Sequence, residues 1–275
     1  MAYRQPNYGG GQPRRRGRSL KGMLLIFLLV GGFSLFKYFT NTQVNPITGE
    51  KQHVSISPEQ EVAIGLQSAP QMAQQHGGLH PDQAAQDHVD QVGARLINNT
   101  IARASGYNYD FHLLADPNVM NAFALPGGQV FITAALYSKL ENEDQLAGVL
   151  GHEIGHVIHR HGAERMAKMD LTNGLTGAAV VASGDYNTQQ AAQMIGNLIN
   201  MKYGREQELE SDDFGVRLMI ESGYDPSQLK GVMDILESGS GGGAKPEWQS
   251  THPSHENRRE TIDESIEKYN QELGR

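Results

Sequence analysis

The stretch LGHEIGHVIHRHG, residues 150–162, places four histidines and one glutamate in little more than three helical turns. A helix advances about 100° per residue, so His152 and His156 lie one turn apart on the same face. Two neutral imidazoles in this arrangement can bind a single Zn²⁺ ion. Glu153 lies obliquely beside the pair, where its carboxylate can act as a general base on a zinc-activated water. The stretch therefore predicts a buried zinc-binding helix, in which Gly151 and Gly155 allow a neighbouring segment to approach closely.

The two remaining histidines of the stretch do not complete the ligand set. His159 returns to the face of His152 but lies about 10 Å further along the axis, too far to share one ion. His161 points in another direction, and we expect both side chains to have structural or supporting roles. The longer pattern His-Glu-x-x-His-x-x-Gly-x-x-His would need a third histidine at position 162, where the chain has Gly162. The third ligand must therefore come from elsewhere.

A second predicted helix, residues 203–223, carries several candidate ligands. Glu208 and Asp212 are four residues apart, so they lie side by side on the flank of its apolar face. One carboxylate can bind the metal, and the other can hold a ligand histidine through its free N–H. The spacing leaves Glu206 as an alternative ligand, and Asp213 also lies near the buried face.

Charge is distributed unevenly along the chain. Six of the 23 basic residues lie in the first 21 positions, and no acidic residue precedes Glu50, so the rest carries 17 basic against 31 acidic side chains. The acidic part of the chain after position 21 would repel phosphates, so we expect no nucleic-acid partner. The absence of cysteine excludes disulfides, thiolate metal sites and a cysteine nucleophile.

The N-terminal region predicts a membrane anchor. Residues 1–21 are rich in Gly, Pro, Gln and Arg and predict a disordered basic tail in the cytoplasm. Residues 22–40 are almost entirely apolar and nearly reach the length of about 20 residues that spans a bilayer. The arginines before this segment favour a single-pass signal anchor in the inner membrane, with the catalytic domain in the periplasm and the helix in contact with lipid. A cleaved signal peptide and a buried core helix are the alternatives.

The remaining chain is predicted to form a linker, residues 41–56, followed by one domain, residues 57–275. Ser57 and Gln60 form a capping box, with Pro58 at the first helical position. Alternating and apolar patterns predict the other elements. They are a helix over 81–105, strands over 107–116, 122–125 and 129–133, a helix over 134–140, and one continuous helix over 141–169 that contains the histidine stretch.

Four segments together resemble the M48 family of zinc metallopeptidases. They are NAFALPGGQVFITAAL, LGHEIGHVIHRHGAER, GREQELESDDFG and THPSHENR, and the similarity spans roughly residues 57–266. The resemblance is to the periplasmic members and to the mitochondrial Oma1-like members. It does not extend to the CAAX-processing branch, whose several membrane segments are missing here. One departure is the Gly/Ser-rich stretch 238–245, which predicts a flexible loop.

The resemblance implies an α+β fold, a mainly helical zincin-like domain with a small β-sheet over the active-site helix. It also implies one Zn²⁺ per chain, held by His152, His156 and Glu208, with Asp212 in support. His252 and Arg258, from THPSHENR, are expected near the metal as candidate donors to the developing oxyanion, and a helix-capping or surface position is the alternative for His252. His252 either donates to the developing oxyanion or occupies the open coordination position, and we favour the second because a histidine on a mobile loop is a removable ligand.

A peptidase must hold its substrate in an extended conformation, which an exposed strand edge achieves by backbone pairing. Either predicted strand of NAFALPGGQVFIT can supply this edge. The candidate residues are Asn121, Ala122, Phe123, Gly128, Gln129 and Val130.

These expectations combine into a membrane-anchored zinc endopeptidase. Its expected partners are misfolded or misassembled envelope proteins, in a quality-control role. The alternative is a metal-binding envelope chaperone or assembly factor with little proteolysis, against which an intact Glu153 argues.

Overall fold

The computed structural model describes residues 20–183, 203–238, 247–252 and 257–274. Within them the chain is mainly helical with two small sheets, which confirms the α+β prediction. The larger sheet contains β3 (Asp110–Leu114), β4 (Ala122–Leu125) and β5 (Gln129–Thr133) in the order β3-β5-β4. β5 runs parallel to β3 and antiparallel to β4.

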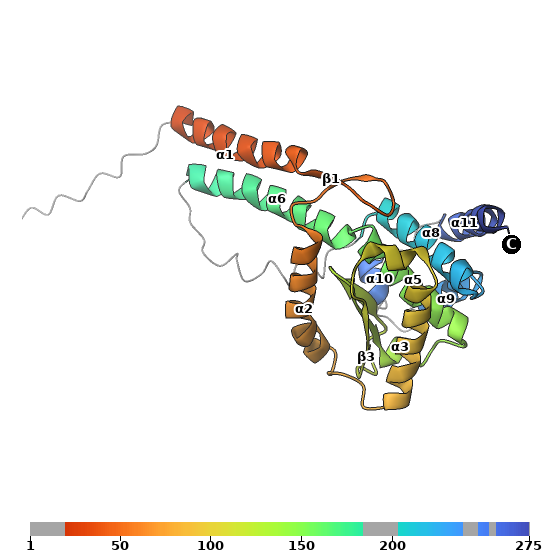
Figure 1. Cartoon of the computed structure of the whole chain (residues 1–275). Coiled ribbons are helices and arrows are strands. Elements are labelled where there is room, and N and C mark those ends of the chain that lie inside the picture. The colour runs from red at the N-terminus through yellow and green to blue at the C-terminus, as the bar shows by residue number, and fades with distance from the viewer. Residues whose placement is uncertain (1–19, 184–202, 239–246, 253–256, 275) are drawn as a thin grey trace, which may run out of the picture.

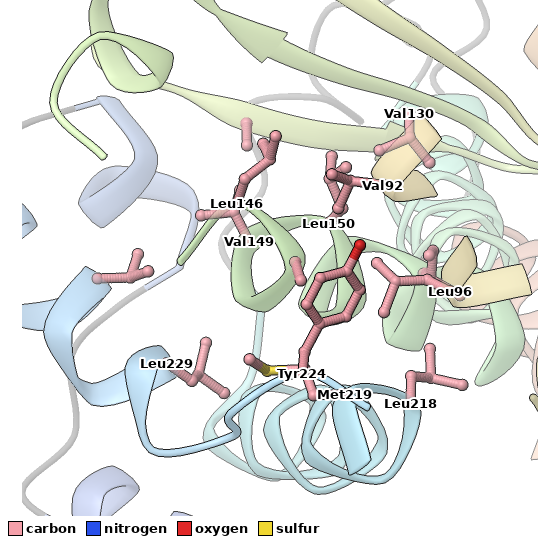
Figure 2. Close-up of a cluster of buried hydrophobic side chains, with 14 of the residues drawn as sticks. Val92, Leu96, Val130, Leu146, Val149, Leu150, Leu218, Met219, Tyr224 and Leu229 are labelled. Atoms are coloured by element: carbon pink, nitrogen blue, oxygen red, sulfur yellow. The ribbon is translucent and has the colours of Figure 1, made fainter. Parts of the chain in front are cut away.

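Helix α5 (Glu143–Ile158) is the centre of the core, and every residue from Gln145 to Ile158 is buried. It packs against α8 (Arg205–Ser222), against the sheet, and against α3 (Gln83–Asn98) and α9 (Gln228–Ser238). Figure 2 shows Leu146, Val149 and Leu150 of α5 enclosed by apolar side chains of these neighbours. The histidine stretch is therefore surrounded by protein on all sides.

Most local signals in the sequence predict the observed elements. α2 (Pro58–Gln75) begins with the expected capping box between Ser57 and Gln60. α8 ends at Gly223, whose φ of 80° is the left-handed conformation that favours glycine. The expected helix over 81–105 is shorter: α3 ends at Asn98, and Thr100 caps a separate 3₁₀ turn, η1 (Ile101–Ser105). α4 (Ala134–Tyr137) is likewise only one turn long.

The prediction of one continuous helix through the histidine stretch is wrong. α5 ends at Ile158, and α6 (His161–Ser183) begins after a turn in which Arg160 has a φ of 54°. This conformation costs roughly 1–2 kcal/mol for a residue with a side chain. Three hydrogen bonds hold the buried guanidinium of Arg160 in place, to the side chains of Glu61 and Gln43 and to the carbonyl of Ile56. The break is thus set by tertiary contacts.

Residues 41–56, the expected linker, instead form a hairpin of β1 (Thr42–Val44) and β2 (Lys51–His53). Its side chains complete the C-terminal end of α5. Asn45 Nδ2 donates to the carbonyl of Ile158 at 2.7 Å, and Gln52 Nε2 donates to the carbonyl of His159. These bonds satisfy carbonyl groups that have no partner within the helix.

Helix α1 (Leu20–Thr40) lies alongside α6, and the two project together from the body of the domain (Figure 1). The apolar side chains of α1 are largely exposed, including those of Leu24, Leu29 and Phe33. In the part of the chain described here, no helix is both long enough and apolar enough to cross a bilayer. The predicted basic tail lies almost wholly outside the described residues.

The C-terminal segment closes the domain over α8. It contains α10 (Glu247–Thr251) and α11 (Arg258–Leu273), and α11 packs on α8. The loop predicted over 238–245 falls outside the described residues except for its first position. Residues 253–256 of THPSHENR, including His255, also lie outside them.

The contact between α5 and α8 depends on glycine at its tightest point. A Cβ on Gly155 would lie 2.9 Å from both Cα and O of Ser211, which real Cβ atoms do not tolerate against backbone. A Cβ on Gly151 would lie 3.4 Å from Gly215, which is ordinary contact. Gly155 therefore lets the two helices carry their functional side chains to one place.

We expect Gly155→Ala to lower the free energy of unfolding by about 1–3 kcal/mol, because the two backbones must separate. Gly151→Ala is the matched control, and it should be neutral or slightly stabilising, since alanine favours helix over glycine. Urea unfolding of both variants measures the difference. Equal stabilities would show that the helix contact does not need glycine at position 155.

Candidate metal centre

Four side chains predicted to surround a metal converge at one point of the structure. His152 and His156 come from α5, Glu208 from α8, and His252 follows α10. One ligand atom of each lies within 4.8 Å of the other three, and all four residues are buried. Two imidazoles alone would not distinguish a metal site from a structural pair of histidines. Four metal-binding groups from three segments converge here, which is typical of a metal centre.

The distances within the cluster fit a coordinated ion. His152 Nε2 and His156 Nε2 are 3.1 Å apart, and each is 3.2 Å from His252 Nδ1. Ligand atoms at the corners of a tetrahedron with metal–nitrogen bonds of about 2.0–2.1 Å are separated by roughly 3.3 Å. Glu208 supplies the remaining corner, since its Oε1 is 3.0 Å from His252 Nδ1 and 3.6 Å from His156 Nε2.

The hydrogen bonds of His152 direct a lone pair towards the centre. Its Nδ1 lies 2.8 Å from Asp212 Oδ1 and must donate, because a carboxylate only accepts. The neutral ring then has no proton on Nε2, which faces the cluster. Asp212 remains ionised: burial opposes its charge, but the charge and hydrogen bonds of Arg258 outweigh burial and lower its pKa to about 2.

Arg258 ties the two carboxylates of α8 together. Its Nε and Nη2 donate to Asp212 Oδ2 and Oδ1 at 2.7 Å, and its Nη1 lies 3.1 Å from Glu208 Oε2. Both carboxylates are fully buried and would be strongly destabilised without a compensating charge. Arg258 therefore positions Glu208 and Asp212, and each of its three nitrogens lies within 3.1 Å of one of these carboxylates.

His156 is oriented by a neighbouring histidine. Its Nδ1 is 2.8 Å from His161 Nδ1, and His161 Nε2 is 2.9 Å from Glu210 Oε2. Burial and the neighbouring carboxylates raise the pKa of Glu210 to about 7. When Glu210 is ionised its carboxylate accepts, so His161 then carries its proton on Nε2 and accepts at Nδ1 from His156. His156 therefore also presents an unprotonated Nε2. Burial lowers the pKa of His156 and of His252 well below the usual range, which keeps both imidazoles neutral, as metal binding requires.

Glu153 lies at the edge of the cluster, and among the described residues it forms no salt bridge with a lysine or an arginine. Its Oε1 accepts from Trp248 Nε1 at 3.3 Å and lies 3.6 Å from His252 Nε2. Its Oε2 is buried without a hydrogen-bond partner among the described residues. Burial raises the pKa of this carboxyl group, although His252 and Trp248 partly offset the effect. A buried carboxylate with a raised pKa is suited to accept and return a proton.

His252 provides the fourth potential ligand atom of the cluster. Its Nδ1 faces both ligand histidines and Glu208, while its ring stacks on Trp248 at 4.7 Å. In this position the imidazole completes a four-ligand shell. Its Nε2, on the other side of the ring, lies 3.6 Å from Glu153 Oε1 and has no hydrogen-bond partner among the described residues. The two predicted roles of His252, ligand and oxyanion donor, stay predictions.

The sequence-derived alternatives to Glu208 lie elsewhere. Glu206 is exposed and lines a separate cavity, and Asp213 accepts hydrogen bonds from Ser265, Lys268 and Tyr269 of α11. Neither side chain belongs to the cluster around His152.

Two residues that shape the centre, Trp248 and Tyr203, are not predicted by the sequence analysis. Trp248 covers Glu153 and His252, and it is the single tryptophan of the chain, which is a weak signal available in advance. Tyr203 stacks on His156 with ring centroids 3.7 Å apart, and its hydroxyl accepts from Arg165 at 2.7 Å. His161 was predicted only as a supporting residue, because its contact with His156 depends on the turn at Arg160.

The two candidate substrate strands differ in one decisive respect. β5 is paired on both sides, so the expectation that Gln129 and Val130 offer an open edge is wrong. β4 pairs only with β5 among the described strands, and it packs on α5. Asn121, Ala122 and Phe123 therefore lie at the sheet edge, but all three are buried, so the predicted exposure of this edge is not seen. Gly128, with a φ of 107°, forms the bend between the strands.

We expect Asp212→Asn to weaken metal binding about 10- to 100-fold, because the amide disturbs both the tautomer of His152 and the ion pair with Arg258. Asp213→Asn, on the adjacent position of α8 but outside the cluster, is the matched control and should retain the metal. Competition with a chromogenic chelator measures both affinities. An Asp212→Asn protein that binds metal as tightly as Asp213→Asn would contradict the assigned role.

Comparisons with known proteins agree with this geometry. Residues 83–266 match the family described as Peptidase family M48. The chain is 27% identical over 263 residues to the mitochondrial metalloendopeptidase OMA1 of Schizosaccharomyces pombe, covering 94% of this chain and 75% of the relative. It is 30% identical over 265 residues to the metalloendopeptidase OMA1 of Bos taurus, covering 88% and 50%.

A third relative is bacterial, the beta-barrel assembly-enhancing protease of Yersinia pestis. It is 31% identical over 228 residues, which are 78% of this chain and 45% of the relative. The chain thus spans about half the length of the bovine and bacterial relatives and three quarters of the fission-yeast one. The family match covers more than half of the chain and includes every residue of the metal cluster. The chain belongs to peptidase family M48.

Proposed function

We propose that the protein is a zinc-dependent endopeptidase. The observation that carries the proposal is the buried cluster of three imidazoles and Glu208, with the unpartnered oxygen of Glu153 beside it. The family and the names of the relatives, metalloendopeptidase and protease, support the same activity. The donor set of two histidines and one glutamate is typical of catalytic zinc.

In this proposal His152, His156 and Glu208 hold the metal, one ion per chain. Zinc, when bound, polarises the scissile carbonyl and lowers the pKa of water at the site. Glu153 accepts the proton of the attacking water and delivers it to the leaving nitrogen. Asp212 and Arg258 keep the ligands in place: Asp212 fixes the tautomer of His152, and Arg258 compensates the charges of both carboxylates.

His252 closes the centre in the resting state. Its imidazole nitrogen fills the position that the attacking water needs, so turnover requires this side chain to leave. In the sequence it directly precedes Pro253 and follows the Gly/Ser-rich stretch 238–245, a composition typical of flexible loops. We therefore place the control of activity in the release of His252 from the metal.

The substrate lies along β4 in this proposal. Most residues of β4 are buried in this structure, so the edge must first be uncovered. It can then pair with an extended peptide of any sequence, which suits an enzyme that acts on unfolded chains. Asn121, at the start of the edge, donates to Glu247 Oε1 at 3.3 Å, which connects the edge to the segment that carries His252. Substrate binding and release of His252 can therefore influence each other.

We further propose that the protein is anchored in the inner membrane by residues 22–40, with its domain in the periplasm. The exposed apolar side chains of α1 support this, as do the arginines that precede it. The relatives named as mitochondrial or as assisting β-barrel assembly support a role in the quality control of misfolded or misassembled envelope proteins.

We expect Glu153→Gln to retain zinc and the fold but to lose at least about 10²-fold in turnover, because an amide cannot accept the proton. Degradation of casein by the zinc-loaded variant measures this. Glu206→Gln removes an exposed carboxylate of α8 and serves as a control with normal turnover. Near-wild-type cleavage by a metal-replete Glu153→Gln protein would exclude Glu153 as the base.

We expect His252→Ala to raise peptidase activity, since the coordination position is opened to water while three ligands remain. Cleavage of a quenched fluorescent peptide, with zinc content measured in parallel, tests this. A donor to the oxyanion would give the opposite result, with turnover lower by about 10²-fold and zinc retained. That result would reject the closed resting state.

A further inference from the structure

A second group of metal-binding side chains lies next to the first. His159, His161 and Glu210 each offer one ligand atom, and these atoms lie within 4.8 Å of one another. Both histidines are buried, and their rings stack with centroids 5.3 Å apart. Two imidazoles and one carboxylate form the same donor set that the proposed catalytic site uses, so this group is chemically suited to zinc as well.

The surroundings of this group favour a cation. Glu210 borders a cavity of about 490 Å³, and its side chain is 38% exposed, so an ion can reach it from solvent. Glu50, which lies 3.2 Å from His159 Nδ1, is 47% exposed at the same cavity. Four carboxylates face two lysines here. The carboxylates are Glu50, Glu164, Glu206 and Glu210, and the lysines are Lys51 and Lys168.

The two metal-binding groups are connected through a single imidazole. His161 accepts a hydrogen bond from His156 at Nδ1 and donates one to Glu210 from Nε2. A metal on His161 Nε2 needs the lone pair of that nitrogen, so the proton of the neutral ring must move to Nδ1. Two N–H groups would then face each other across the 2.8 Å between His161 and His156. His156 would lose the acceptor that orients it.

We propose that His159, His161 and Glu210 form an outer zinc site whose occupancy weakens the hold of His156 on the catalytic metal. Glu210 changes from hydrogen-bond acceptor to ligand, and His161 changes tautomer, so no proton leaves the ring. Excess zinc therefore acts as an inhibitor at a place distinct from the catalytic ligands. The inhibitory consequence rests on the proposed function, whereas the existence of the outer site does not.

The full chain, dialysed against rising free Zn²⁺, provides the test, with zinc per chain measured by mass spectrometry. Two variants remove the outer site and preserve its neighbours. His159→Phe keeps the ring that stacks on His161 but has no nitrogen. Glu210→Gln keeps an acceptor for His161 but is a poor ligand. Glu206→Gln, on the wall of the same cavity but outside the cluster, is the control for the loss of one charge.

We expect two zinc ions per chain in the wild type and in Glu206→Gln, and one ion in His159→Phe and in Glu210→Gln. As the second ion binds, casein turnover by the wild type should fall about tenfold or more. This is the typical effect of removing the hydrogen-bond partner of a metal ligand. His159→Phe should keep its own turnover as zinc rises.

One ion in the wild type at every zinc concentration would overturn the outer site and leave the proposed function intact. Two ions in both His159→Phe and Glu210→Gln would also overturn it, because the second ion would then lie elsewhere. A wild-type chain without bound zinc would contradict the proposed function and this inference together.

Discussion

The arrangement of protons outside the metal cluster determines what its interior can do. His152 gives its one proton to Asp212, and His156 gives its proton to His161, so two unprotonated nitrogens face each other at 3.1 Å. No hydrogen bond can join these two nitrogens directly, because neither carries a proton, and a cation between them would relieve the repulsion of their lone pairs. Each outer partner is in turn held in place, Asp212 by Arg258 and His161 by Glu210.

The fold brings these partners together through two tight features. Gly155 lets α5 and α8 approach closely enough for His152 to meet Asp212 and for the ligand histidines to meet Glu208. The turn at Arg160 ends α5 just after the ligand pair and turns His161 back onto His156. A continuous helix would carry His161 away from it. The break in the helix is therefore a functional part of the centre.

The sequence predicts the parts of this site that depend on residues close together in the chain, and it does not predict the parts that depend on distant ones. His152, Glu153 and His156 share one helix, so their spacing alone predicts their geometry. Glu208 lies on another helix, where spacing left Glu206 open and only the family resemblance distinguished them. The turn at Arg160 depends on hydrogen bonds to residues 43, 56 and 61. Because these residues are distant in the sequence, no local pattern predicts the turn. The hairpin within the expected linker was missed for the same reason.

The central claim is that the resting centre is closed, with three imidazoles and one carboxylate around the metal. X-ray absorption spectroscopy of the zinc-loaded full chain tests it most directly. The account predicts a four-coordinate shell at about 2.0–2.1 Å in which three imidazoles contribute, falling to two in His252→Ala. A wild-type shell with only two imidazoles, unchanged in His252→Ala, would contradict it.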